Sequence, residues 1–449
     1  MKNKKLVKVL SSLLAASVIF TGCSSTKNNQ PSSADPTPTN NSSESKPTTE
    51  PEKNELSGSI TFSAWDVDTQ MPYIKDMLAE FMSQHPGVNV EIVDIPSADY
   101  DTKLNIDLNG GAAADVILVK NASTMPSMNQ KGQLVDLNEY IKRDNVDLSS
   151  YNGLDKSISI NGTQPGLPFR TDYYVLYYNK DIFDTAGVAY PSNDMTWADF
   201  EELAKKVTFG EGANKVYGAH LHTWQALVEN WAIQDGKNTT MGPDYEFMKP
   251  YYEMALRMQN DDKTIMDYAT LKTANIHYSG VFQNGSVAML PMGTWFMATM
   301  RDVVSKGECS VNWGVATIPH PEGLEAGNTV GSATPISINA ASKNKELAWE
   351  LIKFMTGDSG ASYLASVGQL PARINPELLD TVTSLEGMPE GAKEALQVKN
   401  IVLDRPIVDN VNEVDKMLGE EHSLIMLGEV TIDEGIKAFT ENSKTIQEQ

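Results

Sequence analysis

The chain has 449 residues, of which 41% are hydrophobic and 21% charged, a composition typical of a globular protein with two or three domains. It carries 36 basic and 59 acidic residues, and this net charge of -23 argues against nucleic acid as a partner. Two cysteines and six scattered histidines argue against a disulfide-rich scaffold and against a cysteine- or histidine-rich metal site. We therefore expect an acidic globular protein with no metal and no cofactor.

Residues 1–22 have the pattern of a secretory signal peptide. A lysine-rich start precedes an apolar stretch from Val9 to Phe20, which is shorter than the ~20 residues needed to span a bilayer with ease. The segment ends in Phe20-Thr21-Gly22-Cys23, which resembles the bacterial lipobox except that Phe20 replaces an aliphatic residue. The resemblance implies that Cys23 carries a lipid such as palmitate and anchors the chain on the outer face of the cytoplasmic membrane. Ordinary secretion is the alternative.

Residues 23–56 are predicted to form a lipidated cysteine followed by a disordered tether. The stretch after Cys23 is almost entirely Ser, Thr, Pro, Asn, Glu and Lys. Such a segment cannot bury enough apolar surface to offset the entropy of ordering. The tether would hold a globular part off a membrane, and Cys309 would remain a small buried thiol.

The globular part begins with alternating strand and helix patterns. Apolar residues alternate over 60–64 and 88–92, and they recur at helical spacing over 73–81 and 100–108. A continuous apolar run at 115–119 is typical of a strand that is buried on both faces. This order predicts a parallel sheet with crossover helices, and such sheets bind ligands beyond the carboxyl ends of their strands.

The same pattern returns in the second half of the chain. Tyr173–Tyr178 and Trp313–Ile318 have the composition of strands. Thr196 and Asp199 form the spacing of a capping box at the start of a helix. Glu346–Met355 predicts a further helix. The chain is therefore expected to be an α/β protein.

Five segments in this order carry a family resemblance: Gly58–Asp66, Ala114–Val119, Gly166–Val207, Gly280–Trp295 and Val311–Met355. From about Ser57 onward the chain resembles the extracellular solute-binding proteins of ABC importers, in the sugar-binding group that includes maltodextrin-binding proteins. The resemblance covers nearly 90% of the chain, and the last ~60 residues match least.

The resemblance implies a hinged, two-lobed periplasmic-binding-protein-like fold of type II, with a mainly parallel sheet flanked by helices in each lobe. Lobe 1 is expected to contain residues 57–169 and 316–368, and lobe 2 residues 170–315 and 369–449. The protein would be a monomer that captures a mono- or oligosaccharide between the lobes and delivers it to the transmembrane subunits of an ABC permease. It would have no catalysis of its own.

Candidate ligand-binding residues follow from the chemistry of a sugar. Sugar hydroxyls favour charged or amide partners, and the C–H faces favour aromatic planes. The resemblance implies roles for Asp172 beside the hinge, for Trp295 as a stacking residue, and for Gly331 as a close backbone approach. Strand ends add Trp65, Asp66 and Asn121, and Arg170 and Tyr174 flank Asp172. The resemblance implies a ligand-contacting pair where His222 and Trp224 stand, which makes Trp224 a further candidate. Arg373 and Arg405 could reach the cleft from the C-terminal lobe, with surface ion pairs as the alternative.

Other functions stay open at this point. The same fold could bind a polyamine, which needs several carboxylates, or a sugar phosphate, which needs clustered basic residues. A secreted glycosidase could use two carboxylates such as Asp66 and Asp172. His220 and His222 alternate as on a strand, but they lack a third metal ligand and are expected to be polar groups near the cleft.

Overall fold

The computed structural model describes residues 56–69, 71–151 and 153–448, which lie in one compact unit. The predicted signal peptide, the lipid site at Cys23 and nearly all of the predicted tether lie outside the described residues.

The first lobe is built on the predicted parallel strands. β1 pairs in parallel with both β2 and β3, and the helices that follow β1 and β2 place their apolar faces against this sheet. The expected alternation of strand and helix is thereby confirmed. The elements are β1 (Ser57–Trp65), α1 (Tyr73–Gln84), β2 (Gly87–Ile95), α2 (Tyr100–Gly110), β3 (Val116–Leu118), α3 (Met125–Gln130), α4 (Asn138–Asp144) and α5 (Leu154–Ser157).

The second lobe contains a mixed sheet. β4 (Leu167–Asn179) pairs antiparallel with β6 and β7, whereas β5 and β6 are parallel. The capping box at Thr196 and Asp199 is present, as predicted. The elements up to β7 are α6 (Lys180–Ala186), α7 (Trp197–Lys206), β5 (Tyr217–Ala219), α8 (Ala226–Ile233), α9 (Lys249–Leu256), α10 (Tyr268–Thr273), α11 (Tyr278–Gln283), β6 (Val287–Gly293), α12 (Trp295–Ser305) and β7 (Trp313–Thr317).

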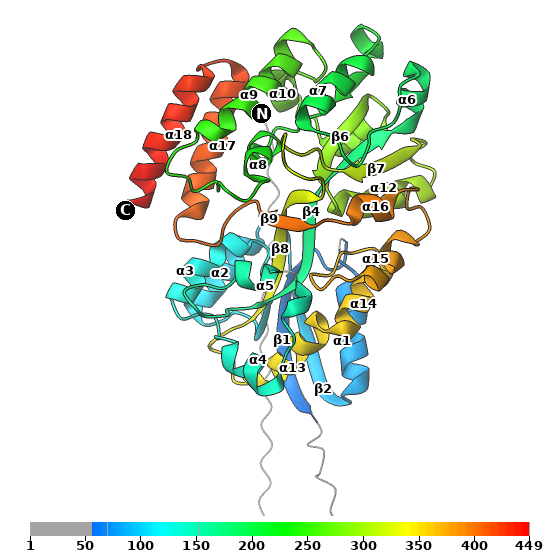
Figure 1. The fold of residues 1–449 in the computed structure, drawn as a ribbon. Coiled ribbons are helices and arrows are strands. Elements are labelled where there is room, and N and C mark those ends of the chain that lie inside the picture. Colours follow the sequence, from blue (N-terminus) through cyan, green and yellow to red (C-terminus); the bar gives the residue numbers. More distant parts are fainter. Residues whose placement is uncertain (1–55, 70, 152, 449) are drawn as a thin grey trace, which may run out of the picture. The chain divides into compact units, whose positions relative to one another are not determined.

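Two long strands connect the lobes (Figure 1). The first half of β4 pairs with β8 (Asn328–Ile338), and the second half pairs with β6 and β7. At its far end β8 also pairs with β3 of the first lobe. Residues 313–317 therefore lie in the second sheet, and the chain returns to the first lobe through β8.

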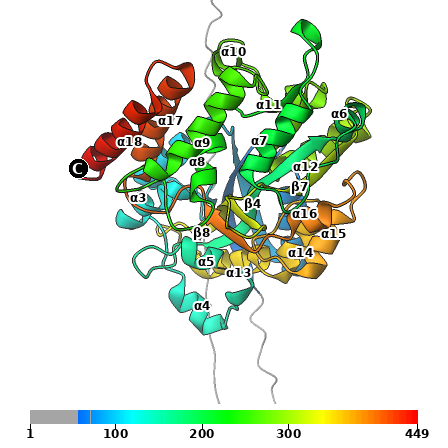
Figure 2. The same cartoon turned by 45° about the horizontal axis from the view of Figure 1, so that its top comes forward.

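The remaining elements cover both lobes. α13 and α14 contribute to the core around β1, while α15 and α16 pack with α12 in a separate cluster. Figures 1 and 2 show α17 and α18 lying side by side at the edge of the second lobe. The elements are α13 (Lys345–Thr356), α14 (Asp358–Ser366), α15 (Pro376–Thr383), α16 (Ala392–Leu396), β9 (Asn400–Leu403), α17 (Val411–Leu427) and α18 (Ile432–Gln447).

Residues 404–410, which we call the interlobe strap, connect β9 to α17. The strap begins beside the second lobe, but Ile407 is only 7% exposed and belongs to the hydrophobic core of the first lobe. α17 then returns to the core of the second lobe through Val414 and Leu418. Because apolar burial stabilises by about 25 cal/mol per Å², Ile407 anchors the strap to the first lobe. Cys309 is buried and free, as expected for a packed thiol.

A buried polar network joins three helices of the second lobe. The Tyr252 hydroxyl on α9 lies 2.8 Å from Glu229 Oε1 on α8 and 3.0 Å from His422 Nδ1 on α17. Burial raises the pKa of Glu229 to about 8 and lowers the pKa of His422 to about 3. Both side chains are therefore uncharged at neutral pH, which avoids the large cost of a buried unpaired charge.

This network predicts a pH dependence of stability. Between about pH 4.5 and pH 8 the folded state keeps a proton on Glu229 that the unfolded state has lost, so rising pH through this window destabilises the fold. Glu229→Gln keeps the hydrogen-bond acceptor and removes the ionisation. We expect the loss of unfolding free energy from pH 6 to pH 8 to be smaller by about 2 kcal/mol in the variant.

Chemical denaturation at both pH values measures this difference. Glu253→Gln, on the exposed side of α9, is the matched control and should follow the parent protein. Parallel pH curves for the parent and Glu229→Gln would show that Glu229 is already ionised in the folded state.

Candidate functional site

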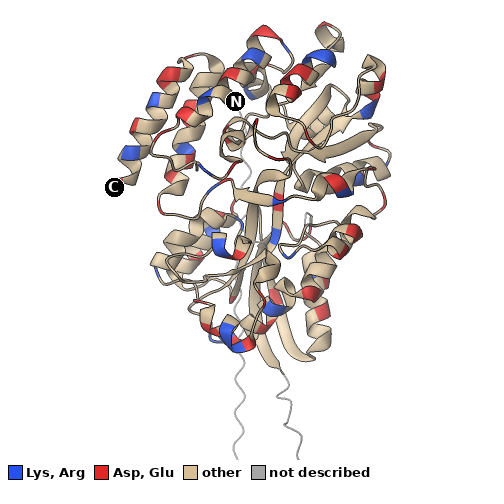
Figure 3. Cartoon of the chain, viewed as in Figure 1, with Lys and Arg blue, Asp and Glu red and all other residues tan. Residues whose placement is uncertain are grey.

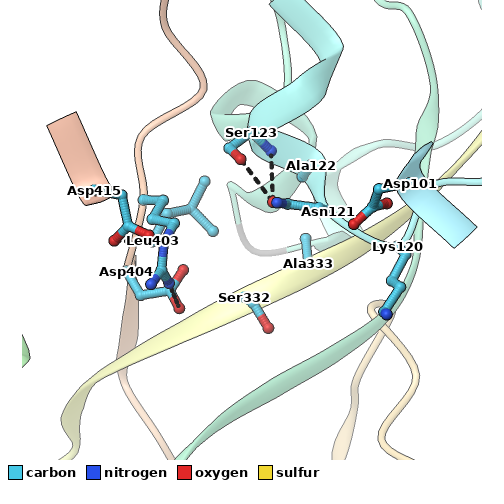
Figure 4. A pocket seen from close by; sticks show the side chains of 11 residues that line it. Asp101, Lys120, Asn121, Ala122, Ser123, Ser332, Ala333, Leu403, Asp404 and Asp415 are labelled. Atoms are coloured by element: carbon cyan, nitrogen blue, oxygen red, sulfur yellow. Dashed lines mark hydrogen bonds and ion pairs between the residues drawn. The ribbon is translucent and has the colours of Figure 1, made fainter. Parts of the chain in front are cut away.

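A cavity of about 370 Å³ lies where the two lobes meet, a size within the usual range for small-molecule sites. Figure 4 shows Asn121 and Ser123 on one side, Asp404 and Asp415 on the other, and Ala333 of β8 between them. Its lining residues are Asp101, Lys120, Asn121, Ala122, Ser123, Ser332, Ala333, Leu403, Asp404, Arg405 and Asp415.

The first-lobe wall begins just beyond the carboxyl end of β3. Asn121 caps a short 3-10 helix, and its Oδ1 accepts hydrogen bonds from the backbone N–H (3.3 Å) and the hydroxyl (2.6 Å) of Ser123. An Asn side chain also carries two N–H donors. Sequence reasoning placed Asn121 at this strand end, and the structure places it in the cavity wall. An amide held in this way can donate to a ligand hydroxyl.

The opposite wall is an ion-paired cluster. Arg405 donates from Nη1 to Asp404 at 3.0 Å and from Nε to Asp415 at 2.8 Å. Gln225 Nε2 also donates to Asp415, at 3.0 Å. Burial raises the pKa of Asp404, and the positive charge of Arg405 opposes this rise. The carboxylates of Asp404 and Asp415 raise the pKa of Arg405, although its burial acts in the opposite direction. The guanidinium therefore stays charged and fixes both carboxylates.

Pairing of β9 with β8 positions this cluster. Gly331 of β8 lies opposite Leu403, and its carbonyl accepts from the Asp404 N–H at 2.9 Å. A Cβ on Gly331 would lie 2.4 Å from the carbonyl oxygen of Asp172 and 2.8 Å from Tyr173 Cβ. Only a glycine lets the three strands β4, β8 and β9 approach this closely.

Another cavity of about 390 Å³, with aromatic walls, lies beside the first one. It shares Arg405 and Asp415 with that cavity and adds Tyr174, Trp224 and Trp295 as aromatic walls. The rings of Tyr174 and Trp295 meet edge to face, with their centroids 5.7 Å apart. Trp295 Nε1 donates a hydrogen bond of 3.2 Å to the Tyr278 hydroxyl. Trp224 is 38% exposed. These rings offer apolar faces beside the ion-paired cluster.

The imidazole ring of His222 packs against the ring of Trp224. Their rings meet edge to face, with centroids 4.7 Å apart. Burial and the neighbouring His277 lower the pKa of His222 to about 4, so the imidazole is neutral at physiological pH. No group of three or more His, Cys, Asp or Glu side chains within the described residues could hold a metal ion.

Four of the predicted site residues come together at these two cavities: Asn121, Tyr174, Trp224 and Trp295. Arg405, also considered from the sequence, lines both.

The other predicted residues do not line either of these two cavities in the described part of the chain. Trp65 is 6% exposed and packs edge to face on Tyr100 at 5.2 Å. Asp66 Oδ1 accepts from the Ser97 N–H at 2.9 Å. Arg373 pairs with Asp358 at 3.2 Å. Direct ligand contacts by these residues remain predictions.

Asp172 and Arg170 both lie on β4 but make different contacts. Asp172 accepts a hydrogen bond of 2.9 Å from the Thr294 hydroxyl, and Thr294 directly precedes Trp295. Asp172 therefore fixes the turn that presents Trp295. Arg170 donates to the Tyr73 hydroxyl at 3.3 Å and to Gln369 Oε1 at 3.0 Å. Binding roles for Asp172, Arg170 and Gly331 also remain predictions.

Several cavity residues escaped the sequence reasoning. Asp404 follows the four-residue strand β9, so the rule that ligands gather at strand ends could have found it. Asp415 lies within α17 and Asp101 within α2. No local pattern distinguishes these two from ordinary surface carboxylates of a helix.

The ion-paired cluster predicts coupled effects on stability. Arg405→Met would leave Asp404 and Asp415 without their cation and should lower the free energy of unfolding by roughly 1–3 kcal/mol. Adding Asp404→Asn should recover part of this loss, because it removes one of the two uncompensated charges. Chemical denaturation of the single and double variants measures the coupling.

Arg143→Met is the matched control, because Arg143 pairs with Asp144 and Glu346 on an exposed surface. Its cost should stay below about 1 kcal/mol. Equal costs for Arg405→Met and Arg143→Met, with no recovery in the double variant, would contradict a coupled cluster at the cleft.

Comparison with known proteins identifies the family. Residues 65–362 match the family model described as bacterial extracellular solute-binding protein. A sugar transporter protein of Rhizobium etli, solved in an open conformation, is 39% identical with a TM-score of 0.81, covering 86% of this chain and 99% of that chain. An ABC substrate-binding protein of Listeria monocytogenes in complex with cycloalternan is 26% identical with a TM-score of 0.74, covering 87% and 99%.

A sequence relative agrees with these structures. The maltodextrin-binding protein of Bacillus subtilis is 24% identical over 322 residues, which are 68% of this chain and 71% of that protein. Among the described helices, none has the length and apolar character to cross a membrane. The two-lobed fold, the interlobe cavities and the family match lead to one conclusion: the chain belongs to the bacterial extracellular solute-binding proteins.

Proposed function

We propose that the chain captures a carbohydrate between its lobes and delivers it to the transmembrane subunits of an ABC permease. The observation that carries this proposal is that an aromatic cavity and a polar cavity lie side by side and share Arg405 and Asp415 as lining residues. Tyr174, Trp224 and Trp295 would stack on the C–H faces of sugar rings. Asn121 and the carboxylates would bind sugar hydroxyls.

The names of the relatives support a carbohydrate. The Rhizobium etli protein is called a sugar transporter, the Listeria monocytogenes protein binds cycloalternan, and the Bacillus subtilis protein is a maltodextrin-binding protein. The strands β4 and β8, which connect the lobes, would bend as the hinge when the lobes close. The permease would then recognise the closed form.

The charge balance of the site favours a neutral ligand. Arg405 already pairs with Asp404 and Asp415, and Lys120 opposes the burial-driven rise in the pKa of Asp101. A polyamine would find these carboxylates largely neutralised, and a sugar phosphate would find the guanidinium already occupied. A glycosidase needs one protonated carboxyl group as a proton donor. Asp404 and Asp415 are both ion-paired with Arg405, which favours a site that binds its ligand without hydrolysing it.

Charged residues elsewhere are mixed in sign. Figure 3 shows acidic and basic residues interspersed along the helices of both lobes, with pairs such as Lys103–Asp107 at helical spacing. A chain with this surface and a net charge of -23 would resist self-association. We propose a monomer anchored outside the cell by a lipid on Cys23.

A panel of ligands tests the proposed function. Thermal shift assays should compare sugars, sugar phosphates and polyamines, and a neutral sugar should raise the melting temperature. A ligand at 100 times its Kd adds about 2.7 kcal/mol to the unfolding free energy. Trp224→Ala and Trp295→Ala should each weaken sugar binding by about tenfold or more, since each removes an aromatic wall.

The exposed aromatic residue Tyr190, outside both cavities, provides the control variant Tyr190→Ala, which should bind like the parent. A shift with polyamines or sugar phosphates alone would overturn the carbohydrate proposal. Hydrolysis of a glycan by the purified protein would favour the glycosidase alternative instead.

The lipid anchor has a separate test. In the expressing cell, the parent protein should fractionate with membranes and incorporate labelled palmitate, whereas Cys23→Ser should be released or remain unprocessed. Cys309→Ser is the control for a thiol that carries no lipid. Equal labelling of the parent and Cys23→Ser would place any lipid elsewhere.

A further inference from the structure

A second cavity of about 500 Å³ lies directly beside the polar cavity. The two share Asp101 and Ser123 as lining residues. The second cavity is the larger, and its walls again come from both lobes, from α2 and α3 on one side and from residues 408–413 on the other. The cleft therefore continues beyond the site described above.

A hydrogen-bonded bridge between the lobes marks the boundary. The Ser123 hydroxyl on the first lobe contacts Asn412 Oδ1 on α17, and Asn412 Nδ2 donates to the Ser123 carbonyl oxygen at 3.4 Å. We call this pair the Ser123–Asn412 bridge. Ser123 lines both cavities, whereas Asn412 lines only the second, so the bridge stands between them.

The chemistry of the bridge makes it easy to open. A serine hydroxyl has one proton, yet the Ser123 hydroxyl faces two acceptor oxygens, Asn121 Oδ1 at 2.6 Å and Asn412 Oδ1. Only one of them can accept that proton at a time. When the proton goes to Asn121, the bridge keeps only the long contact from Asn412 Nδ2. A ligand hydroxyl can therefore replace Asn412 at little cost.

The walls beyond the bridge suit a sugar more than an apolar ligand. They carry the amides of Asn105, Gln130 and Asn410, the hydroxyls of Thr124 and Ser127, and the charged side chains of Lys131, Asp409 and Glu413. Amides and hydroxyls both donate and accept hydrogen bonds, as sugar hydroxyls do.

We propose that the second cavity is an extension of the binding site for longer oligosaccharides, and that the Ser123–Asn412 bridge is the gate that admits them. This inference rests on the proposed carbohydrate function. A short saccharide would fill the aromatic and polar cavities and leave the bridge closed. A longer one would displace Asn412 and place its additional units between α3 and the start of α17. The favoured ligand is therefore an oligosaccharide rather than a monosaccharide.

Two series of increasing length test the inference by titration calorimetry: malto-oligosaccharides from maltose to maltoheptaose, and β-galacto-oligosaccharides from lactose upward. In the parent protein, affinity within the recognised series should rise by about tenfold once the chain is long enough to pass the bridge. Ser127→Trp, at an exposed position of the second cavity, should abolish this rise and leave the shortest member unchanged.

Asn412→Ala should strengthen binding of the long members by a few-fold, because they no longer displace a partner of Ser123, and should leave the short members unchanged. Ser366→Trp on α14 and Asn442→Ala on α18, both exposed, are the matched controls. Thermal melts of each variant verify that it folds.

The outcomes separate the two proposals. Binding of short members with no gain on lengthening, or a gain that survives Ser127→Trp, overturns the extended site while the carbohydrate function stands. No effect of Asn412→Ala on the long members overturns the gate. Failure of every saccharide to bind, both in the two series and in the thermal-shift panel, contradicts the proposed function, and the extended site with it.

Discussion

β4 and β8 pair antiparallel where the two lobes meet, and every wall of the cleft is positioned relative to this pair. β8 supplies the cavity floor, β9 pairs with its outer edge and delivers Asp404, and Asp172 of β4 holds the turn before Trp295. The close approach of the three strands depends on Gly331, where a side chain would collide with the β4 backbone. The strands that connect the lobes therefore also carry the ligand site. If these strands bend when the lobes close, the walls of the site would move together.

The charged side chains of the second-lobe wall form ion pairs with one another before any ligand binds. Arg405 is fixed between Asp404 and Asp415, and Gln225 adds a further hydrogen bond to Asp415. Carboxylates held in this way keep lone pairs for a ligand hydroxyl but lose much of their attraction for a free cation. The aromatic walls lie directly beside this cluster. Placing polar and apolar surfaces side by side matches the two kinds of surface on a sugar ring.

Local patterns were sufficient for much of the fold and for part of the site. Alternation predicted β1 and β2, helical spacing predicted α1, and the end of β3 predicted Asn121. The same strand-end rule selected Trp65, whose ring packs edge to face on Tyr100. The local sequence does not reveal which side chain at a strand end packs into the core and which one lines a cavity. Asn412 and Asp415 lie on α17 and make their contacts at the cleft with residues far earlier in the chain, Ser123 and Gln225 respectively. Such contacts have no signal in a single sequence.

The interlobe strap has a consequence for how the chain can fold. The hydrophobic core of the first lobe contains residues from Ile60 to Ile407. This core therefore lacks part of its interior until more than nine-tenths of the chain has been synthesised. The core of the second lobe includes Phe439, so it is completed later still. Contacts across such sequence separations form slowly, because long loops must close first. A nascent chain would therefore remain open until late in its synthesis, and a chain truncated before the strap would expose apolar surface rather than yield one finished lobe.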